Sequence, residues 1–326
     1  MPIHTHIDYS PPRWLKNRKH LQTIYPTLLR PTPPLSYLRE RIPTPDGDFL
    51  DLDWSRVKGT KLVIVLHGLE GSADTKYVRG MIRAFNRRGW DGMGLNFRGC
   101  SGETNILPRA YHSGDTGDID YVIQRINDHH HYEEIVLIGF SLGGNVTLKY
   151  LGEKGNQVPA NLTRGVAFSV PCDLESCSYN LARFENFIYM QRFMKSLRQK
   201  VREKIHLMPE GIQVNQLRNF SQFDDAITAP LHGFENAVDY WTKSSSKQFI
   251  PGIRIPTLLV NAANDPFLTP ECFPKEEAEQ NPWFTLEVPG QGGHTGFPTQ
   301  SFDGEYWTES RAVTFAMEEK QLAVGF

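Results

Sequence analysis

The segment IVLIGFSLGGNVTLKY, Ile135–Tyr150, decides the fold class, because one sharp turn in it joins two different patterns. It begins with a continuous apolar run, typical of a buried strand, and then reads as a helix. The turn holds Ser141, with Gly139 two residues before it and Gly143 two residues after it. Such a tight turn has room only for small neighbours. The segment therefore predicts a serine presented at the end of a strand, which is the arrangement called a nucleophile elbow.

The remaining sequence repeats the alternation of strand and helix on which an elbow depends. Amphipathic helices are expected near residues 77–85 and 119–126, and a closing helix over residues 307–319. Strands are expected over residues 48–54, 61–67, 92–96, 134–139, 164–170, 257–262 and 283–288. This alternation predicts an α/β fold with a mostly parallel central sheet and helices on both faces. A chance glycine-rich turn is the alternative for the elbow, but the strand before it and the helix after it weigh against that reading.

Two parts of the chain interrupt the alternation. Residues 1–45 are rich in proline and basic residues, and we expect them to form an extended or loosely helical N-terminal arm packed on the body. Residues 173–250 contain helix-like pieces and no convincing strand, so we expect a helical cap insertion there. The core of the α/β fold would then comprise residues 46–172 and 251–326.

The cap contains one long segment, residues 180–204, with a broad apolar face and a run of lysines and arginines. Its apolar face could cover an acyl pocket, because phenylalanine and methionine adapt to varied chain shapes. It could equally be an ordinary helix packed on the body, and the sequence leaves both readings open. The basic run is expected to form a solvated face rather than a lipid-binding one.

A serine hydroxyl needs a base to become a nucleophile, and the base needs an acid that orients it. In an elbow fold the acid and then the histidine follow the serine along the chain. His294 lies in a glycine-rich loop after the last expected strand, whereas His206 and His232 fall in the cap and are expected to be surface residues. Asp265 follows the preceding strand and is the candidate acid, although Asn-Asp-Pro is also a good turn sequence.

The negative charge that develops on the substrate oxygen needs hydrogen-bond donors. The backbone N–H of Leu142, the residue after the serine, is one expected donor. The other is assigned to the N–H of Leu69, because His67 and Gly68 follow an expected strand and free the backbone to turn inward. The expected site comprises a catalytic set, two oxyanion donors and three shaping glycines: Ser141, Asp265 and His294; Leu142 and Leu69; Gly139, Gly143 and Gly68.

Composition narrows the function classes further. A formal net charge of −2 over 326 residues argues against nucleic acid as the main partner. No run approaches the ~18 apolar residues needed to span a bilayer, and the first residues lack the apolar region of a signal peptide. The four cysteines favour neither a disulfide scaffold nor a zinc site, and a cytoplasmic setting is expected. These cysteines are Cys100, Cys172, Cys177 and Cys272.

Two other groups of residues have ordinary explanations. Asp115, Asp118 and Asp120 could suggest a metal site, but carboxylates at a helix start are expected from capping and from the helix dipole. Cys100 lies near the expected site and could suggest a second nucleophile, but no separate base and acid are left for it. We expect a structural loop at Cys100.

Eight short motifs along the chain resemble those of the α/β-hydrolase superfamily and, within it, of the YheT-like branch of serine esterases. The matching motifs are RWLKNRKHLQTIYP (13–26), HGLEGS (67–72), NFRGCSGE (96–103), HSGDTGDID (112–120), GFSLGGN (139–145), SVPCDL (169–174), NDPF (264–267) and GGHTGF (292–297). The resemblance implies hydrolysis of carboxylic esters, with neither a metal nor an organic cofactor. This branch is associated with short- to medium-chain acyl esters, acylglycerols and, in some relatives, phospholipids.

The expected function is therefore a serine hydrolase that cleaves small-molecule carboxylic esters through an acyl-enzyme on Ser141. The same residues would also serve an acyltransferase, a thioesterase or an amidase. A catalytically silent binding protein is a further alternative, because this architecture hosts many functions.

Overall fold

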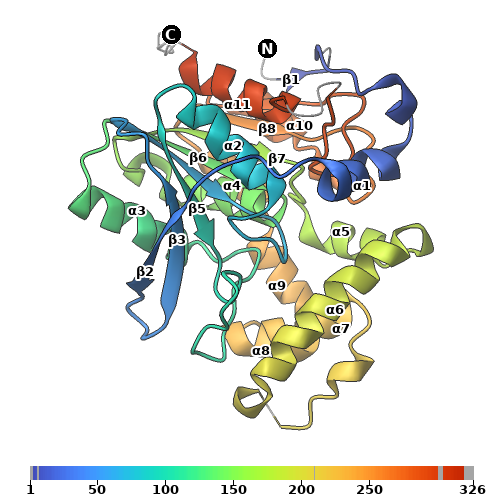
Figure 1. The fold of residues 1–326 in the computed structure, drawn as a ribbon. Coiled ribbons are helices and arrows are strands. Elements are labelled where there is room, and N and C mark those ends of the chain that lie inside the picture. Colours follow the sequence, from blue (N-terminus) through green and yellow to red (C-terminus); the bar gives the residue numbers. More distant parts are fainter. Residues whose placement is uncertain (1–2, 6, 209, 300–303, 319–326) are drawn as a thin grey trace.

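One central sheet organises the chain in the computed structural model, which describes residues 3–5, 7–208, 210–299 and 304–318 (Figure 1). Nine strands of the described residues pair in the order β1-β9-β8-β7-β6-β4-β5-β3-β2. They are β1 Ile3–His4, β2 Leu38–Pro43, β3 Phe49–Ser55, β4 Lys61–Leu66, β5 Asp91–Asn96, β6 Glu134–Phe140, β7 Leu162–Phe168, β8 Thr257–Val260 and β9 Phe284–Glu287. The pairings of β3 with β2 and β5 are antiparallel, and the others are parallel. The predicted mostly parallel sheet is confirmed.

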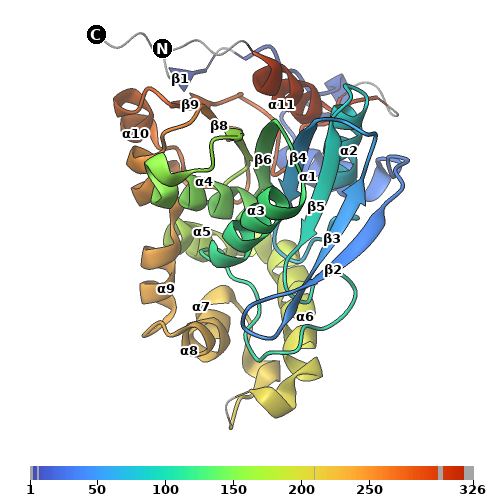
Figure 2. The same cartoon turned by 90° about the vertical axis from the view of Figure 1, so that its left-hand side faces the viewer.

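Helices cover both faces of this sheet (Figures 1 and 2). The helices of the described residues are α1 Lys19–Leu29, α2 Lys76–Asn86, α3 Gly117–His129, α4 Leu142–Lys154, α5 Leu174–Leu181, α6 Phe187–Glu203, α7 Phe220–Phe223, α8 Ala229–His232, α9 Ala237–Ser244, α10 Lys275–Gln280 and α11 Trp307–Met317. Side chains of α3, α4 and α10 join the core on one face, and those of α2 and α11 join it on the other. Residue 319, at the end of the expected closing helix, lies outside the described residues.

Strand β4 shows why the centre of the sheet reads as a continuous apolar run. Leu62, Ile64 and Leu66 pack toward α3 and α4, whereas Val63 and Val65 pack toward α2 and α11. Successive side chains of a strand point to opposite faces, so a strand that is covered on both faces needs apolar residues at every position. All five of these side chains are fully buried.

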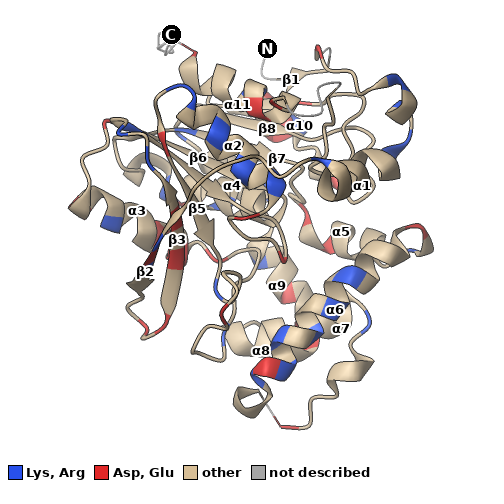
Figure 3. Ribbon diagram, viewed as in Figure 1, with Lys and Arg blue, Asp and Glu red and all other residues tan. Residues whose placement is uncertain are grey.

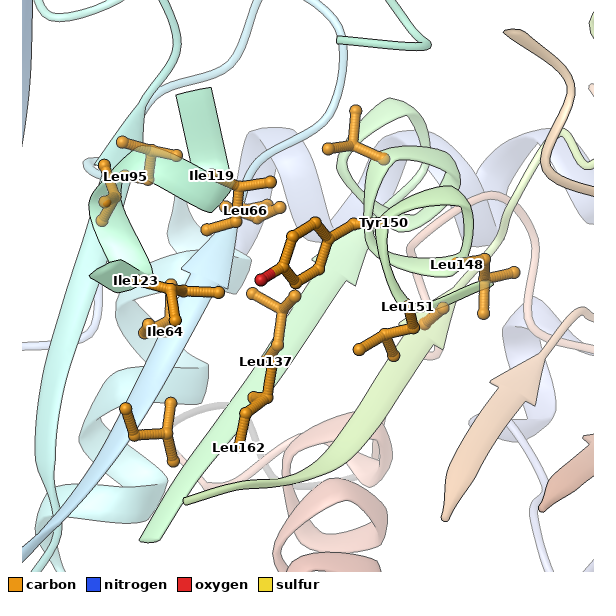
Figure 4. Packing of buried hydrophobic residues seen from close by; sticks show 14 of the residues in the cluster. Ile64, Leu66, Leu95, Ile119, Ile123, Leu137, Leu148, Tyr150, Leu151 and Leu162 are labelled. Carbon is orange, nitrogen blue, oxygen red and sulfur yellow. The ribbon is translucent and has the colours of Figure 1, made fainter. Parts of the chain in front are cut away.

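The packing on the α3 and α4 face appears in Figure 4. Ile119 and Ile123 of α3 meet the sheet one helical turn apart, as the predicted amphipathic spacing requires. Tyr150 of α4 lies beside Leu137 of β6, and its hydroxyl donates to Asp120 of α3 at 3.2 Å. Fully burying one large aliphatic side chain contributes about 1.5–3 kcal/mol, so this layer fixes α4, and the turn that precedes it, firmly on the sheet.

The residues expected as an arm contribute more to the fold than their sequence indicates. They form α1 and also β2, which pairs with β3 at the outer edge of the sheet. Strand β2 carries only one buried side chain, that of Ile42, so its hydrophobic pattern is weak. Cross-strand ion pairs of Arg39 with Asp53 and of Arg41 with Asp51, at 2.7 and 2.8 Å, support the pairing instead. Such pairs depend on register and cannot be read from β2 alone.

Between β7 and β8 the described residues, which omit residue 209, form helices α5 to α9 and no strand. These helices form a layer of their own below the sheet in Figure 1. Helices α5 to α8 contribute to one apolar cluster, which includes Met190 and Met194 of α6 together with Phe223 and is joined by Phe267 of the core. Helix α9 packs in a second cluster with Leu174 of α5. A segment with its own cluster supports our proposal that the chain divides near residues 173 and 250 into a core and a cap.

One acidic side chain is buried inside the cap. Asp224 lies in a π-helical turn, Asp224–Thr228, where its carboxylate accepts hydrogen bonds from the Thr228 hydroxyl at 2.6 Å and from the Trp241 indole N–H at 2.8 Å. Burial raises the pKa of Asp224 from 3.8 to about 7, and the two hydrogen bonds oppose this rise. Between about pH 4 and about pH 7, Asp224 therefore keeps its proton in the folded protein but releases it in the unfolded chain.

We expect this proton to make the stability depend on pH. Because the folded pKa is raised, stability falls as the pH rises through the window and stays low above it. Asp224→Asn does not titrate, so its free energy of unfolding relative to wild type should rise by on the order of 3 kcal/mol between about pH 4.5 and about pH 7.5. Urea unfolding at both pH values measures this, with the exposed Glu235→Gln as the control. An Asp224→Asn difference that does not change with pH would contradict the prediction.

Candidate active site

Ser141 lies at the turn between β6 and α4, in the strand–turn–helix setting that the sequence predicts. Its backbone is strained, with φ at 52° and ψ at −116°, a region that residues with a side chain rarely occupy. Two hydrogen bonds hold it there. Its N–H donates to the Phe168 carbonyl at 2.9 Å, and its carbonyl accepts from the Asn145 N–H at 3.0 Å. The turn places Ser141 at a cavity that Leu181 and Phe223 of the cap also line.

The glycines that flank this turn leave no room for a side chain. A β-carbon on Gly143 would lie 2.6 Å from the carbonyl oxygens of Leu66 and His67 at the end of β4. A β-carbon on Gly139 would collide with the backbone of Gly143. Glycine at position 143 therefore lets α4 begin close to β4, and glycine at position 139 lets it begin close to β6.

The structure brings Ser141, Asp265 and His294 together in the predicted order. The His294 Nε2 atom lies 2.9 Å from the Ser141 Oγ atom, and its Nδ1 atom lies 2.9 Å from the Asp265 Oδ2 atom. The other oxygen of Asp265 accepts the Phe267 N–H at 2.9 Å, and the Phe267 ring lies 4.2 Å from the imidazole. With the Nδ1 proton donated to the buried carboxylate, Nε2 is free to accept the serine proton. The arrangement can deprotonate the serine.

Two backbone N–H groups beside the serine are free to donate. Leu142 is the first residue of α4, so its N–H has no acceptor within the helix. In the part of the chain that the structure describes, the N–H of Leu69 also makes no hydrogen bond. The Tyr77 hydroxyl fixes the loop that carries Leu69, since it accepts the Gly68 N–H at 2.9 Å. A β-carbon on Gly68 would come within 3.2 Å of Ser141, so this loop passes directly beside the serine.

Two cavities meet at Ser141, Leu69 and His294. The inner cavity runs beneath the cap and is lined mainly by apolar side chains, among them Leu181, Leu197, Phe220, Phe223 and Ile227. The outer cleft runs between α1 and α6 and includes Ile24, Leu28, Ile188 and Arg192. Phe193 of α6 lines both. Of the two readings that the sequence leaves open for this segment, a helix over the site is the one that the structure shows.

A family model described as "alpha/beta hydrolase fold" matches residues 61–300. The chain belongs to the α/β-hydrolase family. It is 34% identical over 314 residues to the Escherichia coli (strain K12) protein named "Putative esterase YheT", covering 93% of this chain and 91% of that one. It is 31% identical over 288 residues to the mouse protein named "Phospholipase ABHD3", covering 83% of this chain and 70% of that one. These matches confirm the resemblance to the YheT-like branch.

A solved structure agrees at the level of the fold. The Pyrococcus furiosus esterase Pf2001 aligns with a TM-score of 0.58 at 19% identity, covering 96% of this chain and 98% of that one. None of the helices that the structure describes is long and apolar enough to cross a membrane.

The two cap histidines of this α/β hydrolase differ in their surroundings. His206 is exposed, as expected. His232 is half-buried rather than on the surface, and it lines the inner cavity with its ring 4.4 Å from that of His112. Burial lowers the pKa of both rings to about 3, so both are neutral near pH 7. His232 and His112 meet because α8 packs against the loop before α3. No local sequence pattern reveals this packing.

Two residues of α1 that the sequence analysis did not single out hold the loops of the α/β hydrolase site. The buried Gln22 side-chain oxygen accepts the Asn264 side-chain N–H at 2.9 Å and the Gly292 N–H at 3.0 Å. The Thr23 hydroxyl accepts the His294 N–H at 3.0 Å. Gln22 therefore bridges the residue before Asp265 and the loop before His294. The adjacent polar residues Gln22 and Thr23 stand between apolar residues in the motif RWLKNRKHLQTIYP, which could have indicated a structural role. The motif does not show which residues they bind.

We expect Gln22→Ala to lower the free energy of unfolding by about 3 kcal/mol, because it leaves N–H groups of the half-buried Asn264 and the buried Gly292 without acceptors. The exposed neighbour Leu21 provides the control, and Leu21→Ala should cost less than about 1 kcal/mol. Urea unfolding followed by tryptophan fluorescence measures both, and amide hydrogen exchange should quicken at Gly292 in the first variant only. Equal effects of the two substitutions would show that α1 does not hold these loops.

Proposed function

We propose that this α/β hydrolase cleaves carboxylic esters through an acyl-enzyme on Ser141. The observation that carries the proposal is the position of His294, which lies 2.9 Å from both the Ser141 hydroxyl and the Asp265 carboxylate. An imidazole held in this way is suited to act as a general base toward the serine. The names of the relatives, an esterase and a phospholipase, support an ester as the bond that is cleaved.

In the proposed reaction the Ser141 oxygen attacks the ester carbonyl while His294 takes the hydroxyl proton. The tetrahedral intermediate collapses, the alcohol oxygen leaves and the imidazolium protonates it. Water then attacks the acyl-enzyme, with His294 again taking the proton and returning it to the serine. Asp265 keeps the imidazole in the required tautomer and stabilises its protonated form.

The N–H groups of Leu69 and Leu142 are the proposed donors to the oxyanion of both tetrahedral intermediates. Neither N–H donates to another group within the described residues, and both belong to backbone that the fold holds beside Ser141. Donors fixed in advance stabilise the developing charge without reorganising, and losing one typically slows turnover about 10²–10³-fold. Substitution of either leucine side chain would leave its N–H in place.

The two cavities suit the two parts of an ester. The apolar inner cavity would take a short- to medium-chain acyl group, and the cleft between α1 and α6 would take the alcohol part. Acylglycerols and phospholipids are candidate substrates within this class, the latter supported by the name of the mouse relative. A small-molecule ester is therefore the proposed partner.

Hydrolysis of p-nitrophenyl esters from acetate to palmitate tests the proposal. Ser141→Ala and His294→Ala should each reduce turnover by at least about 10⁴-fold, because the nucleophile and its base act as one unit. His206→Ala, in the exposed part of the cap, should retain wild-type turnover. Circular dichroism would show that the folds are intact.

Three outcomes would count against hydrolysis at this site. Turnover that survives in Ser141→Ala would remove the serine mechanism. Release of p-nitrophenol that requires an added alcohol, amine or thiol would instead identify an acyltransferase that uses the same acyl-enzyme. A fluorophosphonate that fails to label wild-type Ser141 would favour a silent binding protein.

A further inference from the structure

The loop that carries Leu69 continues into a buried charge. Glu70 has a positive φ of 56°, and its side chain is only 7% exposed. Its N–H donates to the Tyr111 hydroxyl at 2.8 Å, and that hydroxyl donates in turn to the Glu70 Oε1 atom at 2.7 Å. The residue after the proposed oxyanion donor is therefore held through its own backbone and side chain.

The cation that balances Glu70 comes from the cap. The Lys200 Nζ atom of α6 lies 2.8 Å from the Glu70 Oε1 atom and 3.0 Å from the Cys100 sulfur, and it lies over the Tyr111 ring. Ser196, one helical turn earlier, donates its hydroxyl to the Glu70 Oε2 atom. Both oxygens of this carboxylate are thus bound by α6, while its backbone belongs to the oxyanion loop.

Two lysines, Lys200 in α6 and Lys204 directly after it, differ from the solvated face expected of this basic run. Lysines and arginines recur along α6 in Figure 3. Lys195 and Arg192 are exposed, but Lys204 is buried and donates to the Asn105 side chain at 2.8 Å and to the Leu107 carbonyl at 2.6 Å. Lys200 and Lys204 therefore fasten α6 to two separate loops of the core. This makes the position of α6 and the position of the oxyanion loop depend on each other.

An unpaired Glu70 would harm the proposed reaction in two ways. Its buried negative charge, next to Leu69, would oppose the negative charge that develops on the substrate oxygen. The carboxylate would also turn toward water or another donor and take the strained loop with it, because a buried charge without a partner is unstable. Lys200 prevents both.

We propose that Lys200 is a positioning residue: through Glu70 it holds the Leu69 N–H in place, so that the oxyanion site is complete only while α6 lies against the loop 67–71. The inference rests on the proposed function of Ser141 and deepens it. Closure of the cap over a substrate and completion of the oxyanion site would then be one event. A substrate that keeps α6 away from this loop would bind and turn over slowly.

Steady-state kinetics on one p-nitrophenyl ester test this, with Lys200→Met as the variant and Lys195→Met as the control. Lys195 lies on the same helix, is exposed and has no ion pair within the described residues. We expect kcat of Lys200→Met to fall about 10- to 100-fold with KM changed by less than about threefold, since the interaction serves the transition state. The affinity of a trifluoromethyl ketone, which forms a tetrahedral oxyanion on the serine, should fall with kcat.

The double variant Glu70→Gln/Lys200→Met shows whether Lys200 acts through Glu70. It leaves no unpaired buried charge, so it should recover part of the kcat that Lys200→Met loses, and it keeps the test open if that single variant fails to fold. The inference would be overturned if the factor by which the double variant loses kcat equals the product of the factors lost by Glu70→Gln alone and by Lys200→Met alone. A folded Lys200→Met with wild-type kcat would also overturn it. Wild-type protein without Ser141-dependent turnover would instead overturn the proposed function.

Discussion

Parallel pairing of β4, β6, β7, β8 and β9 is the constraint on which the site depends. It brings the carboxyl ends of these strands to one edge of the sheet, where ligands of α/β folds bind. The loop after β4 carries Leu69, the turn after β6 carries Ser141, and the loops after β8 and β9 carry Asp265 and His294. Residues far apart in the chain become neighbours because the strands before them are neighbours. The apolar layers on both faces hold this edge in register.

Segments outside the sheet then set the fine geometry of that edge. Gln22 and Thr23 of α1 bind the loops of Asp265 and His294, and Lys200 of α6 binds the loop of Leu69. Each contact satisfies a buried polar group, and a buried polar group without a partner is costly. The arm and the cap thus complete hydrogen bonding that the sheet alone leaves open. The site is a property of three parts of the chain, not of the core alone.

The sequence predicted the features whose signals are local. The elbow glycines, the buried strands and the order of serine, acid and histidine are visible along the chain, because sterics and chain order fix them. It did not predict β2, whose pairing rests on cross-strand ion pairs of Arg39 and Arg41. It also did not predict the partial burial of His232 and Lys200. These features depend on partners that only folding brings close. The sequence around a charged or polar residue does not show whether its partner is water or a distant side chain.

The bridge made by Gln22 also has a consequence for biosynthesis. Its partner Gly292 lies 270 positions later, so α1 leaves the ribosome long before the backbone that it must bind exists. Contacts of such large sequence separation form late and slow folding. During synthesis the Gln22 side chain therefore stays without this partner until residue 292 has been made. A chain that stopped before residue 292 would contain Ser141 and Asp265 but not His294, so it would lack the histidine of the candidate site.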